Sequence, residues 1–255
     1  MEAEFGYDKL PLIPGHEAIG VVAEVGSAAA SYGFQVGDVV GAVCWYGSCT
    51  ECAPCKKIGI QYCPYTGLTG MTRGEYFAEY CLNDAAYSVK VESEVAHRIL
   101  APIFCAGVTV YEAISRAGVT KGTSVAIVGA GGLGQQAIPY VSAMGASPVI
   151  ALDVLDPQLE AVHGKGLADE VINVTKFSTA DIAGTVSKLC GGLGVDVVIV
   201  TSAAVPAYNT AQAIVRPQGQ IIVVGLPHEP IPVPPISISS KCYRLVALPQ
   251  ADQQD

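Results

Sequence analysis

The sequence has few basic residues, and this scarcity limits the partners it can have. Its 255 residues include 14 lysines and arginines against 23 aspartates and glutamates, which gives a net charge of −9. A protein that binds nucleic acid neutralises phosphates with clustered cations, and an anionic membrane surface attracts the same groups. We therefore expect neither nucleic acid nor a membrane surface as a partner.

Long apolar runs, internal repeats and low-complexity tracts are also missing. No run approaches the roughly 20 apolar residues that a membrane-spanning helix needs. Met1–Phe5 has neither the basic region nor the apolar stretch of a secretory signal, so we expect a cytoplasmic protein. With 51% hydrophobic and 15% charged residues, the chain can form the core of one large domain or two ordinary ones.

Cysteine, in contrast, is concentrated in one short stretch. Gaps of two residues let successive sulfurs converge on one ion, and a longer loop returns the fourth sulfur. Four thiolates close the tetrahedral sphere of zinc and leave no position for a substrate, so we expect a structural zinc. The alternative is free or disulfide-paired thiols, but disulfides are rare in reducing compartments. The four residues are Cys49, Cys52, Cys55 and Cys63.

The two halves of the sequence show different patterns. Residues 1 to about 100 are rich in glycine, proline and short β-type runs, which predict strands at 19–25, 39–40 and 75–80. From about residue 107, continuous apolar runs alternate with helical segments, which indicates a buried parallel sheet flanked by helices. The predicted strands lie at about 124–128, 148–152, 170–173, 195–200 and 220–224, and helices at 133–144 and 156–166.

A glycine-rich turn, residues 129–134, fits the pattern G-x-G-x-x-G between a predicted strand and a predicted helix. Gly129 permits the tight turn, Gly131 lets a pyrophosphate approach the backbone, and Gly134 lets the helix pack closely on the strand. The helix N-terminus would present free N–H groups to the phosphates. The expected cofactor-binding residues of this turn are Gly129, Gly131, Gly132, Leu133 and Gly134.

An acidic residue ends the second predicted strand, at Asp153. Its carboxylate can accept hydrogen bonds from both hydroxyls of the adenosine ribose and would repel a 2′-phosphate, which predicts NAD rather than NADP. The alternative is a helix N-cap or an exposed turn residue. Asp156 competes for the same role, but Asp156-Pro157 is typical of a helix start.

Two further features are ordinary when taken singly. Gly15-His16-Glu17 is compatible with a hydrogen-bonded polar pair, and Cys105 lies in an apolar run like a core residue. Together with the other motifs, they resemble the zinc-dependent alcohol dehydrogenases of the medium-chain dehydrogenase/reductase superfamily, and most of all the yeast-type branch. The motifs that carry the resemblance are K-L-P-L-I-P-G-H-E-A-I-G-V-V, G-S-C-T-E-C-A-P-C with the later Cys63, A-P-I-F-C-A-G-V-T-V-Y, G-A-G-G-L-G and A-D-E-V-I-N.

The resemblance implies an α/β protein made of two domains. A partial GroES-like β domain would cover residues 1–106, with its zinc lobe at about 44–64, and a doubly wound Rossmann domain would cover 107–240. Residues 241–255 match nothing in the family. The implied reaction is hydride exchange between NAD and a primary or secondary alcohol, with a small alcohol or aldehyde as substrate and a homo-oligomer as the assembly.

The resemblance also assigns roles to individual residues. His16 and Cys105 match ligands of the family's catalytic zinc, which has two cysteines, one histidine and an open position, and Glu17 matches the acid beside that metal. Thr109 matches a residue near the nicotinamide. Trp45 matches an aromatic wall of the substrate pocket if a one-residue gap is allowed. The four clustered cysteines match the structural zinc ligands.

Two departures from the family pattern lead to further expectations. No C-H-T or C-H-S motif, which supplies the first catalytic cysteine and the proton relay, precedes His16. Residues 241–244 and 251–255 do not match the family either. We therefore expect a chain shortened at both ends, a catalytic zinc site short of one ligand, and a Rossmann sheet that lacks its last strand, whose exposed edge would weaken oligomerisation.

Several alternatives remain open. The chain could be a catalytically impaired homologue that retains the structural zinc and NAD binding, or a dehydrogenase of polyols or other secondary alcohols. A stand-alone zinc-binding interaction module is disfavoured by the strand–helix alternation after residue 120. Cys44 lies in the catalytic half and could be recruited to the metal, but it matches no family ligand, and a core role is the simpler interpretation.

Overall fold

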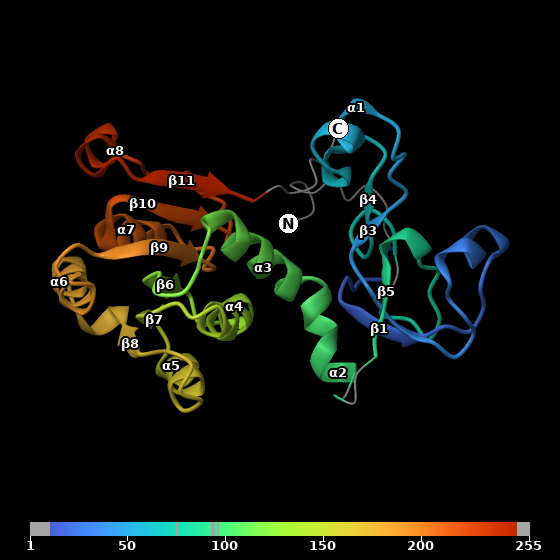
Figure 1. Cartoon of the computed structure of the whole chain (residues 1–255), viewed down its shortest axis with the longest axis horizontal. Helices are drawn as coiled ribbons and strands as arrows, with labels where there is room; N and C mark the ends of the chain where they lie inside the picture. Colours follow the sequence, from blue (N-terminus) through green and yellow to red (C-terminus); the bar gives the residue numbers. More distant parts are fainter. Residues whose placement is uncertain (1–10, 75, 93–94, 96, 249–255) are drawn as a thin grey trace. The chain divides into compact units, whose positions relative to one another are not determined.

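The computed structural model describes residues 11–248, except 75, 93, 94 and 96. The predictions that concern residues 1–10 and 249–255 lie outside these described residues. The chain divides between Cys105 and Ala106 into two compact units (Figure 1). The first unit is rich in short strands, and the second alternates strands with helices.

The first unit contains two small antiparallel sheets. A three-stranded sheet has the order β1 (Ala18–Val21), β2 (Val39–Ala42) and β5 (Ser88–Lys90), and a two-stranded sheet pairs β3 (Trp45–Tyr46) with β4 (Gly67–Leu68). The predicted β-rich first half is therefore confirmed. Short helical segments connect the strands: η1 (Ser27–Tyr32), α1 (Ala53–Lys57), η2 (Ile60–Tyr62), η3 (Ala85–Tyr87), α2 (His97–Leu100) and η4 (Ala101–Phe104).

One strand prediction in this unit is wrong. Residues 76–80 form a bend, residue 75 lies outside the described residues, and the third strand of the sheet is β5 instead. The prediction from the alternating pattern failed because two of the large apolar side chains do not pack on a core. Phe77 and Tyr80 are 77% and 74% exposed in this unit. Alternation predicts a strand only where one face packs on a core.

The second unit is built on a six-stranded parallel sheet with the order β11-β10-β9-β6-β7-β8 (Figure 1). This is the order of a doubly wound dinucleotide-binding fold. The strands are β6 (Val125–Val128), β7 (Val149–Asp153), β8 (Glu170–Asn173), β9 (Val195–Val200), β10 (Val215–Val223) and β11 (Arg244–Ala247). The helical segments are α3 (Ala106–Ala117), α4 (Gly132–Ala143), α5 (Asp156–His163), η5 (Val174–Lys176), α6 (Thr179–Leu189), α7 (Val205–Ile214) and α8 (Pro235–Lys241).

The apolar strands have a core on each face of the sheet. In β6, Val125 and Ile127 belong to a cluster that includes residues of α3, α4 and α5, whereas Ala126 and Val128 belong to a cluster that includes residues of α6 and α7. A strand with helices on both faces must be apolar at every position, which explains the continuous runs in the sequence.

The prediction that the sheet lacks its last strand is wrong. Residues 244–247, placed by the sequence in an unmatched tail, form β11 and pair in parallel with β10 from Gln220↔Arg244 to Val223↔Ala247. The segment is hard to recognise because it is short and at an edge, with Val246 as its one half-buried position. The argument for weakened oligomerisation, which rested on the missing strand, falls away.

Among the described residues, no single helix is long and apolar enough to cross a membrane. One bent pair, His97–Phe104 with Ala106–Ala117, meets the length and composition requirements jointly. Its second helix, α3, buries Val110, Ala113 and Ile114 completely in the core of the second unit.

Candidate metal centres and dinucleotide site

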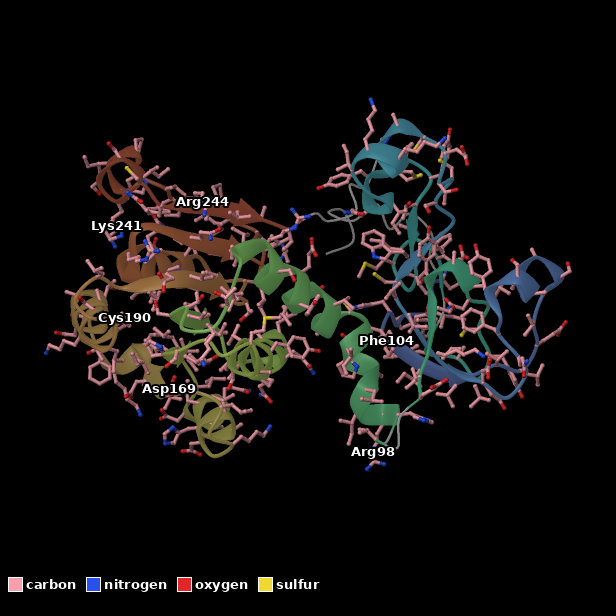
Figure 2. The ribbon with its side chains drawn as sticks, in the orientation of Figure 1. Arg98, Phe104, Asp169, Cys190, Lys241 and Arg244 are labelled. Carbon is pink, nitrogen blue, oxygen red and sulfur yellow. The ribbon has the colours of Figure 1, made fainter. Side chains whose placement is uncertain are left out.

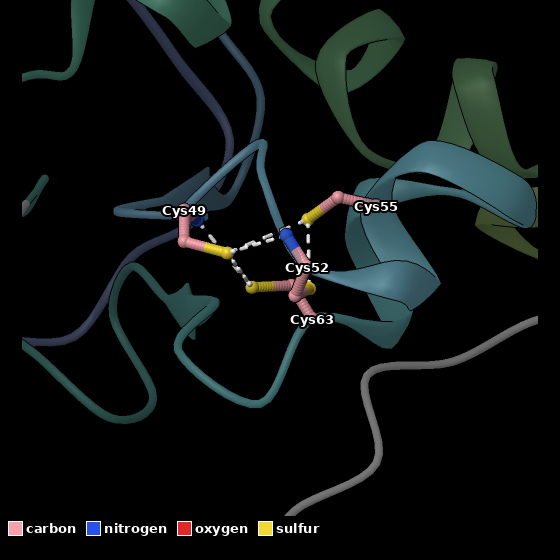
Figure 3. A group of neighbouring side chains, drawn as sticks. All are labelled: Cys49, Cys52, Cys55 and Cys63. Carbon is pink, nitrogen blue, oxygen red and sulfur yellow. Dashed lines mark hydrogen bonds between the residues drawn. The ribbon is translucent and has the colours of Figure 1, made fainter.

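The four clustered cysteines converge around one point in the first unit (Figure 3). The Sγ atoms of Cys52 and Cys55 are 3.4 Å apart, those of Cys49 and Cys63 are 3.6 Å apart, and those of Cys49 and Cys55 are 4.0 Å apart. A tetrahedral zinc with bonds of about 2.3 Å separates its sulfurs by about 3.8 Å. Disulfide sulfurs would lie about 2 Å apart. The cluster therefore fits a four-thiolate structural zinc.

Backbone amides orient these sulfurs. The N–H of Cys52 donates to Sγ of Cys49 over 3.3 Å, and the N–H of Cys49 donates to Sγ of Cys63 over 3.4 Å. The amide of Cys52 is the main cause that lowers the pKa of Cys49. Burial opposes ionisation of Cys63, but backbone donors led by the Cys49 amide outweigh it and lower the pKa to about 6. Burial raises the pKa of Cys55 to about 12. A divalent cation would neutralise the thiolate charge that accumulates in such a cluster.

A second group of possible ligands lies in the same unit, formed by His16, Glu17 and Cys105. One ligand atom from each lies within 4.8 Å of the other two. His16 and Glu17 directly precede β1, and Cys105 directly follows η4, so segments 89 residues apart meet here. An imidazole nitrogen, a thiolate and a carboxylate are all zinc ligands, and this donor set fits a zinc ion.

Two glycine contacts hold the segments that carry these ligands. A Cβ on Gly41 in β2 would come within 1.9 Å of the ring of Phe104, so the absence of a side chain there lets the ring lie against the sheet (Phe104 is labelled in Figure 2). A Cβ on Gly70 would come within 2.1 Å of the carbonyl oxygen of Gly15, and both glycines have positive φ. The chain therefore packs backbone on backbone beside His16 and places an aromatic ring beside Cys105.

The thiol of Cys105 is half-buried, and burial raises its pKa to about 12. Negative charge on Cys44 and on Glu17 raises this pKa further. Burial also raises the pKa of Cys44.

The glycine turn of the second unit has the backbone that its sequence predicts. Gly129 has φ +107°, and a Cβ there would lie 2.8 Å from Oγ1 of Thr201; a Cβ on Gly134 would lie 1.9 Å from the carbonyl oxygen of Gly129. By contrast, a Cβ on Gly131 or Gly132 would meet nothing within 4 Å. Gly129 and Gly134 therefore pack tightly against the protein, whereas there is free space beside Gly131 and Gly132 at the start of α4.

The start of α4 can receive an anion. The first bond of the helix runs from the N–H of Gln135 to the carbonyl of Gly131 over 2.8 Å, so the amides of Gly132, Leu133 and Gly134 have no acceptor within the helix. The turn follows β6, next to β9, where the strand order reverses and ligands of this fold bind. These features fit the pyrophosphate of a dinucleotide.

Asp153 lies at the end of β7, beside this turn. Its Oδ2 accepts the N–H of Ala130 over 2.6 Å, and its Oδ1 accepts the N–H groups of Val154 and Leu155 over 2.7 and 2.9 Å. The carboxylate therefore ties the glycine turn to the second strand. Its contact with a ribose stays a prediction.

Asp156 takes part in a different set of contacts. It starts α5 and accepts from Nζ of Lys176 over 2.8 Å and from the Asn173 amide over 2.7 Å. The Lys176 hydrogen bond, followed by that from Asn173, lowers the pKa of this carboxyl. The prediction that Asp156-Pro157 begins a helix is confirmed.

The structure places the remaining candidate residues on separate elements. Thr109 lies in α3 of the second unit and is half-buried, and Trp45 lies in β3 of the first unit opposite Leu68. Their roles stay predictions. Sequence reasoning missed Thr201, whose Oγ1 donates to the carbonyl of Gly129 over 2.6 Å and fixes the turn. Its position directly after the apolar run 195–200, at the carboxyl end of a strand, was the available signal.

Comparisons with known proteins agree with this architecture. The alcohol dehydrogenase GroES-like domain matches residues 1–93, and the zinc-binding dehydrogenase domain matches residues 132–247. An alcohol dehydrogenase of Geobacillus stearothermophilus is 39% identical over 226 residues, which cover 89% of this chain and 64% of that protein. Alcohol dehydrogenase 1 of Emericella nidulans is 35% identical over 220 residues, covering 86% and 61%.

Solved structures give the same result. The alcohol dehydrogenase of Aeropyrum pernix superimposes with a TM-score of 0.85 at 27% identity, covering 97% of this chain and 71% of that one. The CAD protein of Helicobacter pylori complexed with NADP(H) has a TM-score of 0.78 at 26% identity, covering 95% and 69%. The chain thus spans less than two thirds of the length of the curated relatives given above. The predicted GroES-like and Rossmann folds are confirmed, and the chain belongs to the zinc-binding medium-chain alcohol dehydrogenase family.

Proposed function

We propose that this chain is a zinc- and NAD-dependent alcohol dehydrogenase that exchanges a hydride between NAD and a small primary or secondary alcohol. The observation that carries the proposal is the convergence of His16, Glu17 and Cys105 within 4.8 Å. This group is separate from the four-cysteine cluster, whose closed donor set leaves no position for a substrate. Its mixed donor set leaves such a position open.

The residues have distinct roles in this reaction. When bound, zinc supplies a Lewis acid that polarises the substrate oxygen, and the nicotinamide supplies the hydride acceptor. His16 and Cys105 would hold the metal, and the Glu17 carboxylate lies within reach as a third group. Thr109 is proposed to contact the nicotinamide, and Trp45 to form an apolar wall of the alcohol pocket.

The second unit binds the cofactor in this proposal. The open start of α4 accepts the pyrophosphate, and Asp153 at the end of β7 accepts the ribose hydroxyls. Because a carboxylate repels a 2′-phosphate, this chain should prefer NAD, unlike its Helicobacter pylori relative, which was crystallised with NADP(H).

A catalytically impaired homologue is the second candidate. The observation that favours it is the composition of the second centre: among the described residues, the converging group contains a single thiol. A weakly held metal would leave NAD binding and the four-cysteine zinc intact while turnover is lost.

The test is alcohol-dependent formation of NADH by the purified, zinc-loaded chain, with primary and secondary alcohols and with NAD and NADP compared. We expect turnover with NAD, and we expect His16→Ala to abolish turnover while NADH still binds. NADH binding without turnover of any alcohol in the zinc-loaded chain would instead support the impaired homologue. Absence of both would contradict the proposal.

A further inference from the structure

The second unit contains a hollow with basic side chains for which the proposed function has no use. Its volume is about 380 Å³, and three cations, Lys121, Arg216 and Arg244, line it together with a single carboxylate, that of Asp196. We call this place the basic hollow. The chain as a whole carries a net charge of −9, so three cations around one hollow run against its overall charge.

The basic hollow lies at the end of the parallel sheet that is opposite to the glycine turn. Thr123 lies two residues before β6, Asp196 is the second residue of β9, and Arg244 is the first residue of β11 (Arg244 is labelled in Figure 2). The glycine turn follows the other end of β6, whose four residues span about 13 Å. The hollow is therefore separate from the expected dinucleotide site.

An irregularity in β10 forms one wall of the hollow. The pairing of β10 with β9 is interrupted at residues 216–219, which lie opposite the single residue Asp196. Within this bulge Gln218 has φ +61°, a conformation that is uncommon for a residue other than glycine. Bulges redirect side chains at the edges of sheets and beside binding sites. This one places Arg216 and Gln218 at the hollow.

The turn between α3 and β6 forms another wall. The N–H of Gly122 donates to the carbonyl of Gly145 over 2.8 Å, next to Lys121. Nε2 of Gln220 in β10 donates to the carbonyl of Ala117, at the end of α3, over 3.0 Å. Hydrogen bonds within the protein therefore hold the backbone on both sides of Lys121 and join this turn to the sheet.

The basic side chains of the hollow have donors to spare. Arg216 donates from Nε to Asp196 over 2.6 Å and from Nη1 to the carbonyl of Pro217 over 2.7 Å, but its Nη2 has no acceptor among the described residues. Lys121 and Arg244 are exposed, and neither side chain has an ion-pair partner within the part of the chain that the structure describes. Because Arg216 balances Asp196, two positive charges remain uncompensated.

We propose that the basic hollow binds a small organic phosphate, a phosphomonoester whose charge is about −2 at pH 7. Lysine and arginine are the residues that bind phosphate oxygens, and arginine can do so through two parallel N–H groups. Gln218 and Gln220 also line the hollow, and their side-chain amides can bind hydroxyl groups of the organic part. The volume of about 380 Å³ lies within the range of small-molecule sites, so inorganic phosphate alone would not fill it.

A ligand at this place would connect segments that are far apart in the sequence. They are the turn before β6, the bulge of β10 and the start of the edge strand β11. A ligand that binds the folded chain and not the unfolded one stabilises the fold by mass action. The phosphate should therefore raise the melting temperature of the second unit.

The test is isothermal titration calorimetry of the full chain with glycerol 3-phosphate and with inorganic phosphate, at an ionic strength held constant with NaCl. We expect one glycerol 3-phosphate per chain at the hollow, bound more tightly than inorganic phosphate. Arg244→Gln and Lys121→Gln should each weaken binding about tenfold or more, because each removes a charged donor. Lys165→Gln, which removes an exposed cation elsewhere in the second unit, is the matched control and should bind like the unmodified chain.

Thermal unfolding of the same variants shows whether they are folded. Both substituted side chains are exposed, and they lie on different elements, so the two variants check each other. We expect glycerol 3-phosphate to raise the melting temperature of the unmodified chain and of Lys165→Gln, and to have little effect on Arg244→Gln. An equal rise in all three chains would overturn the proposal.

The start of α4 can also receive a phosphate, so the titration is repeated with saturating NADH. We expect unchanged affinity for glycerol 3-phosphate, because the two sites lie at opposite ends of the sheet. Displacement by NADH, or unaltered binding in both Arg244→Gln and Lys121→Gln, would overturn the proposal. Tighter binding of inorganic phosphate would overturn the assignment to an organic phosphate. The variants decide the question even if the chain does not bind NADH, so the outcome is independent of the proposed dehydrogenase reaction.

Discussion

The side chain of Asp153 helps to hold the fold and is proposed also to bind a ligand. The Asp153 carboxylate accepts three backbone N–H groups, one of them from the glycine turn, and it lies where the ribose of a dinucleotide is expected. Substitution of Asp153 should therefore change both stability and ligand binding.

The cofactor preference leads to a prediction about a single residue, Asp153. Asp153→Ser should weaken NADH binding, because it removes the ribose acceptor and loosens the glycine turn, and it should reduce the preference for NADH over NADPH by about tenfold or more. Dissociation constants from fluorescence titration with both cofactors test this. Asp156→Ser, at the nearby helix start, is the control and should leave the preference unchanged. An unaltered preference in Asp153→Ser would refute the ribose role.

Among the elements, the second unit was well predicted from sequence, because its strands are apolar on both faces. The run 195–200 matches β9 residue for residue, and the helix predicted at 133–144 corresponds to α4. The edge strand β11 was missed because a strand with one neighbour and exposed faces has little pattern. Its position depends on tertiary contacts: Lys241, at the end of α8, donates to the carbonyls of Gln212, Ala213 and Val215 and fixes the chain before the strand (Figure 2).

The candidate site, like the fold, could be predicted from the sequence only in part. The four-cysteine cluster was predictable because its ligands are close in sequence and their spacing alone specifies the geometry. The second centre came from the family resemblance, since His16 and Cys105 are 89 residues apart. The packing beside His16 and Cys105 was not predictable, because it depends on Gly41 and Gly70, whose packing partners only the fold reveals.

A carboxylate that joins three strands gives a prediction at the scale of elements. Asp196 in β9 accepts from the N–H and Oγ of Ser124, before β6, over 2.8 and 2.6 Å, and from Nε of Arg216 in β10 over 2.6 Å. Burial opposes its ionisation, but the Ser124 and Arg216 donors outweigh burial and lower its pKa. Asp196→Asn should therefore reduce the free energy of unfolding at pH 7 by about 1–3 kcal/mol.

The pH dependence of this effect has a definite sign. Because the folded-state pKa of Asp196 is depressed, its contribution is fully present above the unfolded value of about 3.9 and is lost as the pH falls through the folded-state pKa. Urea unfolding should show a difference between the unmodified chain and Asp196→Asn that is constant near neutral pH and shrinks in acid. Glu160→Gln, at an exposed position of α5, should show no such difference. A difference that grows in acid would contradict this account.

At the scale of the whole molecule, the two units depend on different forces. The second unit has a large apolar core on both faces of its sheet, whereas the first unit has small sheets and few fully buried side chains among its described residues. A unit with so little core would draw much of its stability from a structural zinc, because the binding free energy of such an ion adds to that of folding.

Loss of the structural zinc should therefore affect the two units unequally. Cys55→Ser should release the structural zinc and make the first unit sensitive to proteolysis, while the second unit continues to bind NADH. Limited proteolysis with mass spectrometry, together with NADH fluorescence, measures both effects. Cys190→Ser is the control and should retain full zinc and resistance. If Cys55→Ser abolished NADH binding along with zinc, the units would not be independent.

The claim that two distinct zinc centres exist in the first unit is tested most directly by the zinc content of the chain, purified without added metal and measured by native mass spectrometry. The account predicts two zinc ions per chain, one in the four-cysteine cluster and one at the centre of His16 and Cys105. A single zinc would contradict the second centre and the proposed dehydrogenase reaction. A protein that folds without any zinc would contradict both centres.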